Sequence, residues 1–138
     1  MRSPQLQRLV DVNQLPVLDE AGIEEFAHAH PQIMLFFSED PDRYPEANDV
    51  AMVVPELVKA FPGQLQAAIV DEQVERELKL KYGFRRWPAL VFLRGDGYLG
   101  AITEMQNWDD YLRQVHAIIT AEVSRPPLAL LDVSSSES

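Results

Sequence analysis

Hydrophobic and polar positions along this chain follow two different periods, and the changes of period predict a succession of strands and helices. Continuous apolar runs at residues 33–37 and 89–93 are typical of strands buried on both faces. Residues 64–70 predict a further strand, and residues 98–103 return through a glycine-containing turn as the last one. Residues 15–18 predict a short edge strand, because proline is tolerated at the edge of a sheet.

Between these runs, hydrophobic residues recur three and four positions apart, which predicts amphipathic helices. The helical stretches are residues 2–14, 20–30, 49–61, 72–82 and 108–119. The side chains predicted to cap helices are Asp19, Asp71, Asn107 and, for the third helix, either Asn48 or Asp49. Trp108 is expected to lie in the buried stripe of the last helix.

Alternating strands and helices that end in a hairpin and a helix predict an α/β fold, a three-layer sandwich with helices on both faces of a mixed central sheet. The 138 residues, 46% of them hydrophobic, suit one globular domain over residues 1–123 with its core at about 17–121. Residues 124–138, rich in proline and serine, predict a mobile tail. No signal peptide or membrane-length apolar run is visible, so we expect a cytoplasmic protein without membrane insertion.

Charge and cysteine content narrow the classes of function. The chain carries 22 acidic and 12 basic residues, a formal net charge of -10, which disfavours nucleic acid and favours a basic partner. Solubility alone would explain the same charge equally well. There is no cysteine, so the chain has no disulfide, no thiolate nucleophile and no cysteine-bound metal.

The segment from Lys81 to Gly100 resembles the C-terminal half of the thioredoxin fold. A Tyr-Gly pair, the Trp87-Pro88 dipeptide, an apolar strand and a glycine-containing hairpin follow one another at that family's spacing. Pro55, inside the third predicted helix, is a second point of resemblance, and the likeness covers roughly residues 17–121. It implies a cis Trp87-Pro88 bond, whose loop would leave the Trp87 backbone groups free to pair with an extended peptide.

The redox centre of thioredoxins has no counterpart here. Thiol chemistry needs two cysteines at the N-terminus of the helix that follows the second strand, yet residues 38–49 contain none. Phe36 also stands where that family has a buried acid. Disulfide exchange by this chain alone is therefore excluded.

A narrower resemblance is carried by four short motifs. They are Asp40-Pro41-x-Arg43-x-Pro45-Glu46, Glu56-Leu57-x-x-x-Phe61-Pro62, Ala68-Ile69-x-Asp71 and Tyr82-Gly83-x-x-Arg86-x-Pro88. In this order they are similar to the uptake-hydrogenase accessory proteins HyaE, HupG and HoxO, thioredoxin-like proteins without the cysteine pair. The resemblance implies a chaperone, not an enzyme, that recognises the twin-arginine signal peptide of a [NiFe]-hydrogenase small-subunit precursor. Other hydrogenase accessory proteins are further possible partners.

The stretch from Glu39 to Asp49 holds five carboxylates and one arginine, and carboxylates accept paired hydrogen bonds from guanidinium groups. We expect these acids to meet the paired arginines while the tryptophan before the proline offers an apolar contact. The candidate peptide-binding residues are Asp40, Asp42, Glu46, Asp49, Trp87 and Pro88. Two alternatives stay open: Asp49 caps the helix while the other acids are solvated, and Trp87 belongs to the core.

Two other classes of function remain as alternatives. One is a structural thioredoxin-like subunit that scaffolds a larger maturation complex. The other is an enzyme with non-thiol chemistry, which would need a pocket with perturbed titratable groups. The glycines at 95, 97 and 100 match a dinucleotide-binding pattern, but a strand follows them and the hairpin interpretation is favoured. No catalytic residue, metal site or cofactor is predicted.

Overall fold

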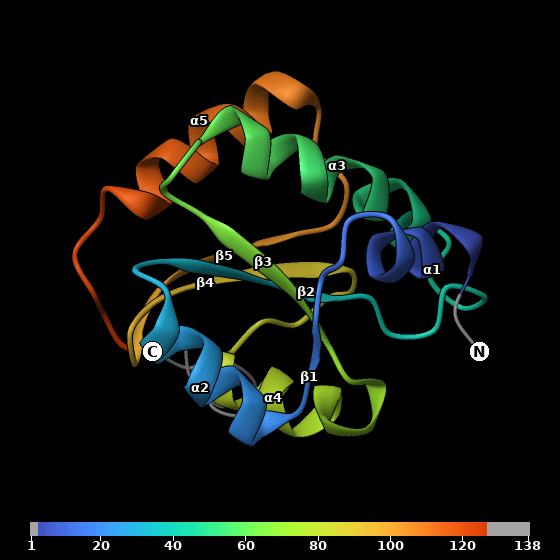
Figure 1. Ribbon diagram of the computed structural model, residues 1–138, viewed down its shortest axis with the longest axis horizontal. Coiled ribbons are helices and arrows are strands. Elements are labelled where there is room, and N and C mark those ends of the chain that lie inside the picture. The colour runs from blue at the N-terminus through green and yellow to red at the C-terminus, as the bar shows by residue number, and fades with distance from the viewer. Residues whose placement is uncertain (1–2, 127–138) are drawn as a thin grey trace, which may run out of the picture.

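Five strands form one sheet in the order β1-β3-β2-β4-β5, and helices cover both of its faces (Figure 1). The computed structural model describes residues 3–126. The elements are α1 (Pro4–Asp11), β1 (Val17–Leu18), α2 (Glu20–Ala29), β2 (Ile33–Phe37), α3 (Glu46–Ala60), β3 (Gln66–Val70), the 3₁₀ turn η1 (Glu72–Val74), α4 (Glu75–Tyr82), β4 (Ala89–Arg94), β5 (Gly97–Thr103) and α5 (Trp108–Ile119).

The sheet is mixed, as expected. Strand β3 runs parallel to both β1 and β2, whereas β4 is antiparallel to β2 and to β5. Helices α1, α3 and α5 lie on one face and α2 and α4 on the other (Figure 1). The three layers confirm the predicted sandwich, and β1 takes the predicted edge position.

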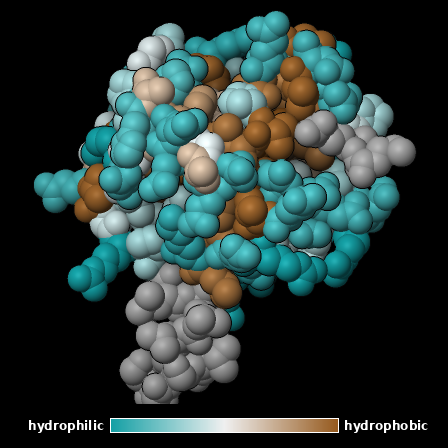
Figure 2. Space-filling view, turned by 60° about the horizontal axis from the view of Figure 1, so that its bottom comes forward, coloured by the Kyte–Doolittle hydropathy of each residue, from teal (hydrophilic) through white to brown (hydrophobic). Residues whose placement is uncertain are grey.

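Alternate side chains of the central strands pack into two separate hydrophobic cores, one on each face of the sheet. Every residue of β2 is buried: Met34 and Phe36 pack with α1, α3 and α5, and Leu35 and Phe37 pack with α2 and α4. A strand buried on both faces must be apolar throughout, which is why this run reads as continuous in the sequence. Figure 2 shows the α2 and α4 side, where a stretch of hydrophobic atoms reaches the surface among hydrophilic ones.

Most predicted caps are confirmed, and one is wrong. Asp19 and Asn107 accept amide hydrogen bonds at the starts of α2 and α5. Helix α3, however, begins at Glu46 with Pro45 as its N-cap, so neither Asn48 nor Asp49 caps it. Pro45 has a helical φ of -58° that suits a helix start, and the helix therefore begins earlier than the side-chain caps predicted.

Two further differences concern single elements. The predicted helix 72–82 is split, because Asp71 caps the short η1 turn and α4 starts only at Glu75. Trp108 is 42% exposed, not buried as predicted. The buried residues of α5 are Tyr111, Val115 and Ile119. Trp108 has the spacing of that face, three residues before Tyr111, but it is the first residue of the helix and precedes the buried row.

The predicted tail begins at residue 124, and residues 127–138 lie outside the described residues. Ser124 itself is still tied to the sheet, since its amide donates to the Tyr98 carbonyl at 2.9 Å. Within residues 3–126, no helix has the length and hydropathy needed to cross a membrane.

Candidate functional site

The acidic loop between β2 and α3, residues 38–45, lies against residues 83–88, the segment that leads into β4. The Trp87-Pro88 bond is cis, as expected. The Trp87 ring packs against Tyr44 of the loop, with 5.7 Å between ring centroids, and edge-on against Phe84 at 6.0 Å. The structure therefore brings together the two segments that the sequence singled out.

Trp87 is neither fully buried nor fully exposed. Its side chain is half-buried, and the indole N–H donates a 2.9 Å hydrogen bond to Oε1 of Glu75. The Lys79 ammonium group stands 4.3 Å from the ring centroid, within cation–π range. Among residues 3–126, neither the amide nor the carbonyl of Trp87 takes part in a backbone hydrogen bond.

Glu75, the first residue of α4, is a buried carboxyl group that joins three segments. Its exposed fraction is 0%, and the Glu39 amide donates to both of its oxygens at 3.0 Å. Burial raises the pKa of Glu75 to about 8, the hydrogen bonds from Glu39 and Trp87 oppose that rise, and the carboxylates of Glu39 and Glu72 add to it. With a pKa of about 8, Glu75 keeps its proton at neutral pH while it holds both the loop and the indole.

Sequence analysis did not single out Glu75. The signal that would have found it is spacing: Glu75, Leu78 and Tyr82 stand at i, i+3 and i+7, on one face of a helix. All three are buried. A glutamate in that row is a buried acid, and a buried acid needs hydrogen-bond donors from elsewhere in the fold.

The four predicted acidic residues differ in how much of each carboxylate is free. Asp40 accepts the Asp42 amide through Oδ1 at 3.0 Å, and Glu46 accepts the Met105 amide through Oε2 at 3.0 Å. Asp42 and Asp49 are exposed. Glu46 and Asp49 lie in the first turn of α3, where the helix dipole favours negative charge.

Pro88 plays a different part from the other predicted residues. It is buried, and its carbonyl accepts the Glu104 amide at 2.9 Å. Of the two residues, Trp87 is therefore the one with a partly exposed side chain. No group of three His, Asp or Glu side chains that suits a metal ion occurs within residues 3–126, so the arrangement offers hydrogen bonds, ion pairs and one aromatic face.

Relatives that are similar in sequence carry names from hydrogenase biology. A protein from Azotobacter vinelandii named "Hydrogenase expression/formation protein HoxO" is 44% identical over 122 residues, which are 88% of this chain and 82% of that protein. A "Hydrogenase expression/formation protein HupG" from Rhizobium leguminosarum bv. viciae is 35% identical over 127 residues, 89% of this chain and 85% of that protein.

Solved structures agree with the fold. A hupG hydrogenase expression/formation protein from Rhodopseudomonas palustris CGA009 is 41% identical and matches with a TM-score of 0.55 over 75% of this chain and 94% of that one. A thioredoxin mutant from Halobacterium salinarum NRC-1 matches with a TM-score of 0.62 over 80% of this chain and 93% of that one. At 19% identity the thioredoxin supports the fold alone.

The family match covers most of the chain. The family model described as "Hydrogenase-1 expression protein HyaE" matches residues 5–111, which include the acidic loop, Glu75 and the Trp87 segment. Together with the relatives above, this match shows that the chain belongs to the HyaE family of thioredoxin-like hydrogenase expression and formation proteins.

Proposed function

We propose that this protein is a cytoplasmic chaperone of [NiFe]-hydrogenase maturation that binds the twin-arginine signal peptide of the small-subunit precursor. The names of its relatives support a role in hydrogenase formation. The absence of cysteine removes the thiol chemistry of its structural neighbours. What remains at the corresponding place is a surface suited to binding.

The observation that carries the proposal is Trp87 beside the acidic loop. Its backbone amide and carbonyl form no backbone hydrogen bond within residues 3–126, and they can pair with an extended peptide as the edge of a sheet does. Its half-buried ring offers an apolar contact next to Tyr44. Exposed Asp42 and Asp49 are the carboxylates most open to the arginines of such a peptide.

A binding role also agrees with the position of Glu75. Its pKa is strongly perturbed, which by itself favours a functional site. Its side chain is nevertheless closed off at 0% exposure, between Glu39 and Trp87. Since a catalytic acid must reach a substrate atom, we assign Glu75 to holding the site together.

Titration calorimetry with a synthetic signal peptide of a hydrogenase small subunit tests the proposal. We expect saturable binding to the wild-type protein and weaker binding when Lys-Lys replaces the arginine pair, because lysine lacks the planar fork. An Asp42→Asn/Asp49→Asn double variant should bind about tenfold more weakly, since two exposed ion pairs are worth up to about 1 kcal/mol each.

The matched control removes the same charge elsewhere. Glu25→Gln/Glu122→Gln changes two exposed carboxylates outside the loop and should leave the affinity within about twofold of wild type. If the wild-type protein does not bind the peptide, or if both double variants lose the same affinity, the proposal is wrong.

The scaffold alternative has its own observation. A groove of about 910 Å³ lies between α1 and α3, and exposed Val12 and Met52 are among its lining residues. Capture of a purified hydrogenase accessory protein without any binding of the signal peptide would favour this alternative. A Met52→Glu variant should then abolish the capture.

A further inference from the structure

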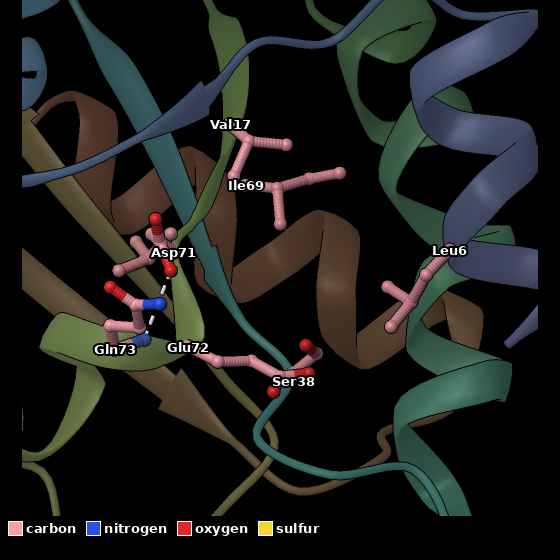
Figure 3. A pocket seen from close by; sticks show the side chains of 8 residues that line it. Leu6, Val17, Ser38, Ile69, Asp71, Glu72 and Gln73 are labelled. Atoms are coloured by element: carbon pink, nitrogen blue, oxygen red, sulfur yellow. Dashed lines mark hydrogen bonds between the residues drawn. The ribbon is translucent and has the colours of Figure 1, made fainter. Parts of the chain in front are cut away.

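A second feature lies at the carboxyl ends of the parallel strands β1, β3 and β2, where ligands of α/β proteins commonly bind. It is a cavity of about 280 Å³. Figure 3 shows it bounded by the first helix, two strand ends and the turn after β3. Its lining residues are Leu6, Val17, Ser38, Ile69, Val70, Asp71, Glu72 and Gln73.

The lining divides into an apolar and a polar part. Leu6, Val17, Ile69 and Val70 supply aliphatic walls, and the remaining four residues supply oxygen-bearing or amide side chains. None of the lining residues is basic, while two are carboxylates. The cavity therefore suits a group with an aliphatic stem and a cationic head.

Glu72 is the carboxylate most open to such a head. It is exposed, and in Figure 3 its side chain extends from η1 towards Ser38. No hydrogen bond or ion pair from its carboxylate is formed within the described part of the chain. Oδ1 of Asp71 accepts a hydrogen bond from the Gln73 amide at 3.0 Å, so Oδ2 is the oxygen that can accept one from a ligand.

Ser38 adds a buried acceptor. Its exposed fraction is 2%, and its hydroxyl donates to the Glu39 carbonyl at 3.2 Å. Because the hydroxyl proton is used there, and because nothing in residues 3–126 donates to the hydroxyl oxygen, Ser38 can offer the cavity only an acceptor. A ligand with several N–H donors would satisfy it.

The charged groups around the cavity are also negative. Glu39 and Glu72 both act on buried Glu75 as repelling negative charges. Three carboxyl groups thus lie near this end of the sheet, with Asp71 beside them. The carboxylates of Glu39, Glu72 and Asp71 would attract an incoming cation.

We infer that this cavity takes the guanidinium side chain of an arginine in a bound peptide, with the stem on the apolar walls and the head on Glu72, Asp71 and Ser38. Arginine buries its aliphatic stem and presents five N–H donors and no acceptor. The volume is slightly below the roughly 300–1,000 Å³ of small-molecule pockets, so it suits one side chain. The inference rests on the proposed function, and the cavity adjoins the acidic loop because Ser38 begins that loop.

The first test uses a probe that is not the signal peptide. N-acetyl-L-arginine methylamide is titrated into the labelled full-length protein and followed by two-dimensional amide NMR, with the citrulline analogue as its uncharged counterpart. We expect saturable shift changes at residues 17–18, 38–39 and 69–73 with the arginine probe only. Equal responses to both probes, or changes confined to other residues, would overturn the inference.

The second test uses a variant with an exposed side chain, which leaves folding intact. Glu72→Gln should weaken binding of the arginine probe by about three- to tenfold, and the matched Glu77→Gln, on an exposed position of α4, should not. If both variants bind as wild type does, the cavity is not the arginine site.

The two proposals fail separately. A signal peptide that binds wild type and Glu72→Gln equally well supports the proposed function and refutes this inference. An arginine probe that binds in the cavity while the signal peptide does not bind refutes the proposed function and leaves the cavity assignment standing.

Discussion

Glu75 is the residue on which the local architecture of the site most depends. It receives hydrogen bonds from an amide 36 positions earlier in the chain and from an indole 12 positions later. Removing one partner of a buried polar contact costs more than the contact itself contributes, because the other partner is left unsatisfied. Substitutions at this residue and at Trp87 should therefore lower the unfolding free energy of the whole protein.

The raised pKa of Glu75 predicts a pH-dependent stability. In the unfolded chain Glu75 loses its proton near pH 4.5, whereas in the folded protein it keeps it up to about pH 8. The folded state therefore binds more protons between these values, and its unfolding free energy should fall as pH rises from 4.5 to 8, by at most about 1.4 kcal/mol per pH unit. Urea unfolding of wild type and Glu75→Gln across this range measures the difference.

The neutral variant should lose that component of the pH dependence, because glutamine does not titrate. Glu72→Gln, which changes an exposed neighbour, serves as the control and should retain most of the slope. Parallel curves for wild type and Glu75→Gln would show that Glu75 is not the group responsible.

The indole N–H of Trp87 gives a second prediction at this scale. Trp87→Phe keeps an aromatic ring but removes the donor to Glu75, so we expect a loss of about 1–3 kcal/mol in unfolding free energy. Trp108→Phe is the matched control, because that side chain is 42% exposed, and it should change stability by less than about 0.5 kcal/mol. Chemical denaturation of the two variants decides between these outcomes, and equal losses would argue against the hydrogen bond.

Among the elements, α5 is fastened to the sheet by one arginine at the end of β4. Arg94 donates from Nη2 to the Ile119 carbonyl at 2.7 Å and from Nη1 to the Ala121 carbonyl at 3.0 Å. The same guanidinium binds Gln32 through Nε and Nη2. A cation at this place also complements the negative end of the helix dipole.

Arg94→Lys should therefore be costly although the charge is kept. Lysine cannot reproduce the planar fork that reaches two carbonyls and an amide oxygen, so we expect a loss of about 1–3 kcal/mol in unfolding free energy. Arg113→Lys, on the exposed side of the same helix, should cost less than about 0.5 kcal/mol. Thermal unfolding of both variants gives a direct comparison. If Arg94→Lys leaves the unfolding free energy unchanged, α5 is held by its apolar row alone.

At the scale of the whole molecule, the net charge of -10 predicts how partners arrive. A cationic peptide should associate faster at low ionic strength, because the Debye length falls from about 30 Å at 0.01 M to about 8 Å at 0.15 M salt. Stopped-flow association of the signal peptide across this range should show a falling rate constant. For a peptide with both arginines replaced by glutamine, the rate constant should depend much less on salt concentration. Equal salt dependences for the two peptides would show that electrostatic steering does not speed the association.

Much of the fold was readable in the chain because its signals are local. Asp19 and Asn107 cap helices that start one residue later, and the apolar runs became β2 and β4. The start of α3 was misplaced, because a proline N-cap needs no side-chain signal. The candidate site was predicted as two segments, whose proximity followed only from resemblance to a known fold. The packing of Tyr44 against Trp87 was not predicted.

The sequence by itself determined the order of strands and helices, the absence of thiol chemistry and the acidic character of the loop, since each follows from residue type and short-range spacing. Only the tertiary structure decided that Glu75 is buried with a perturbed pKa, because desolvation depends on what α4 packs against. The cavity beside Ser38 likewise exists only where segments distant in the chain meet at the strand ends. Contacts of that kind arise from packing, which no local pattern specifies.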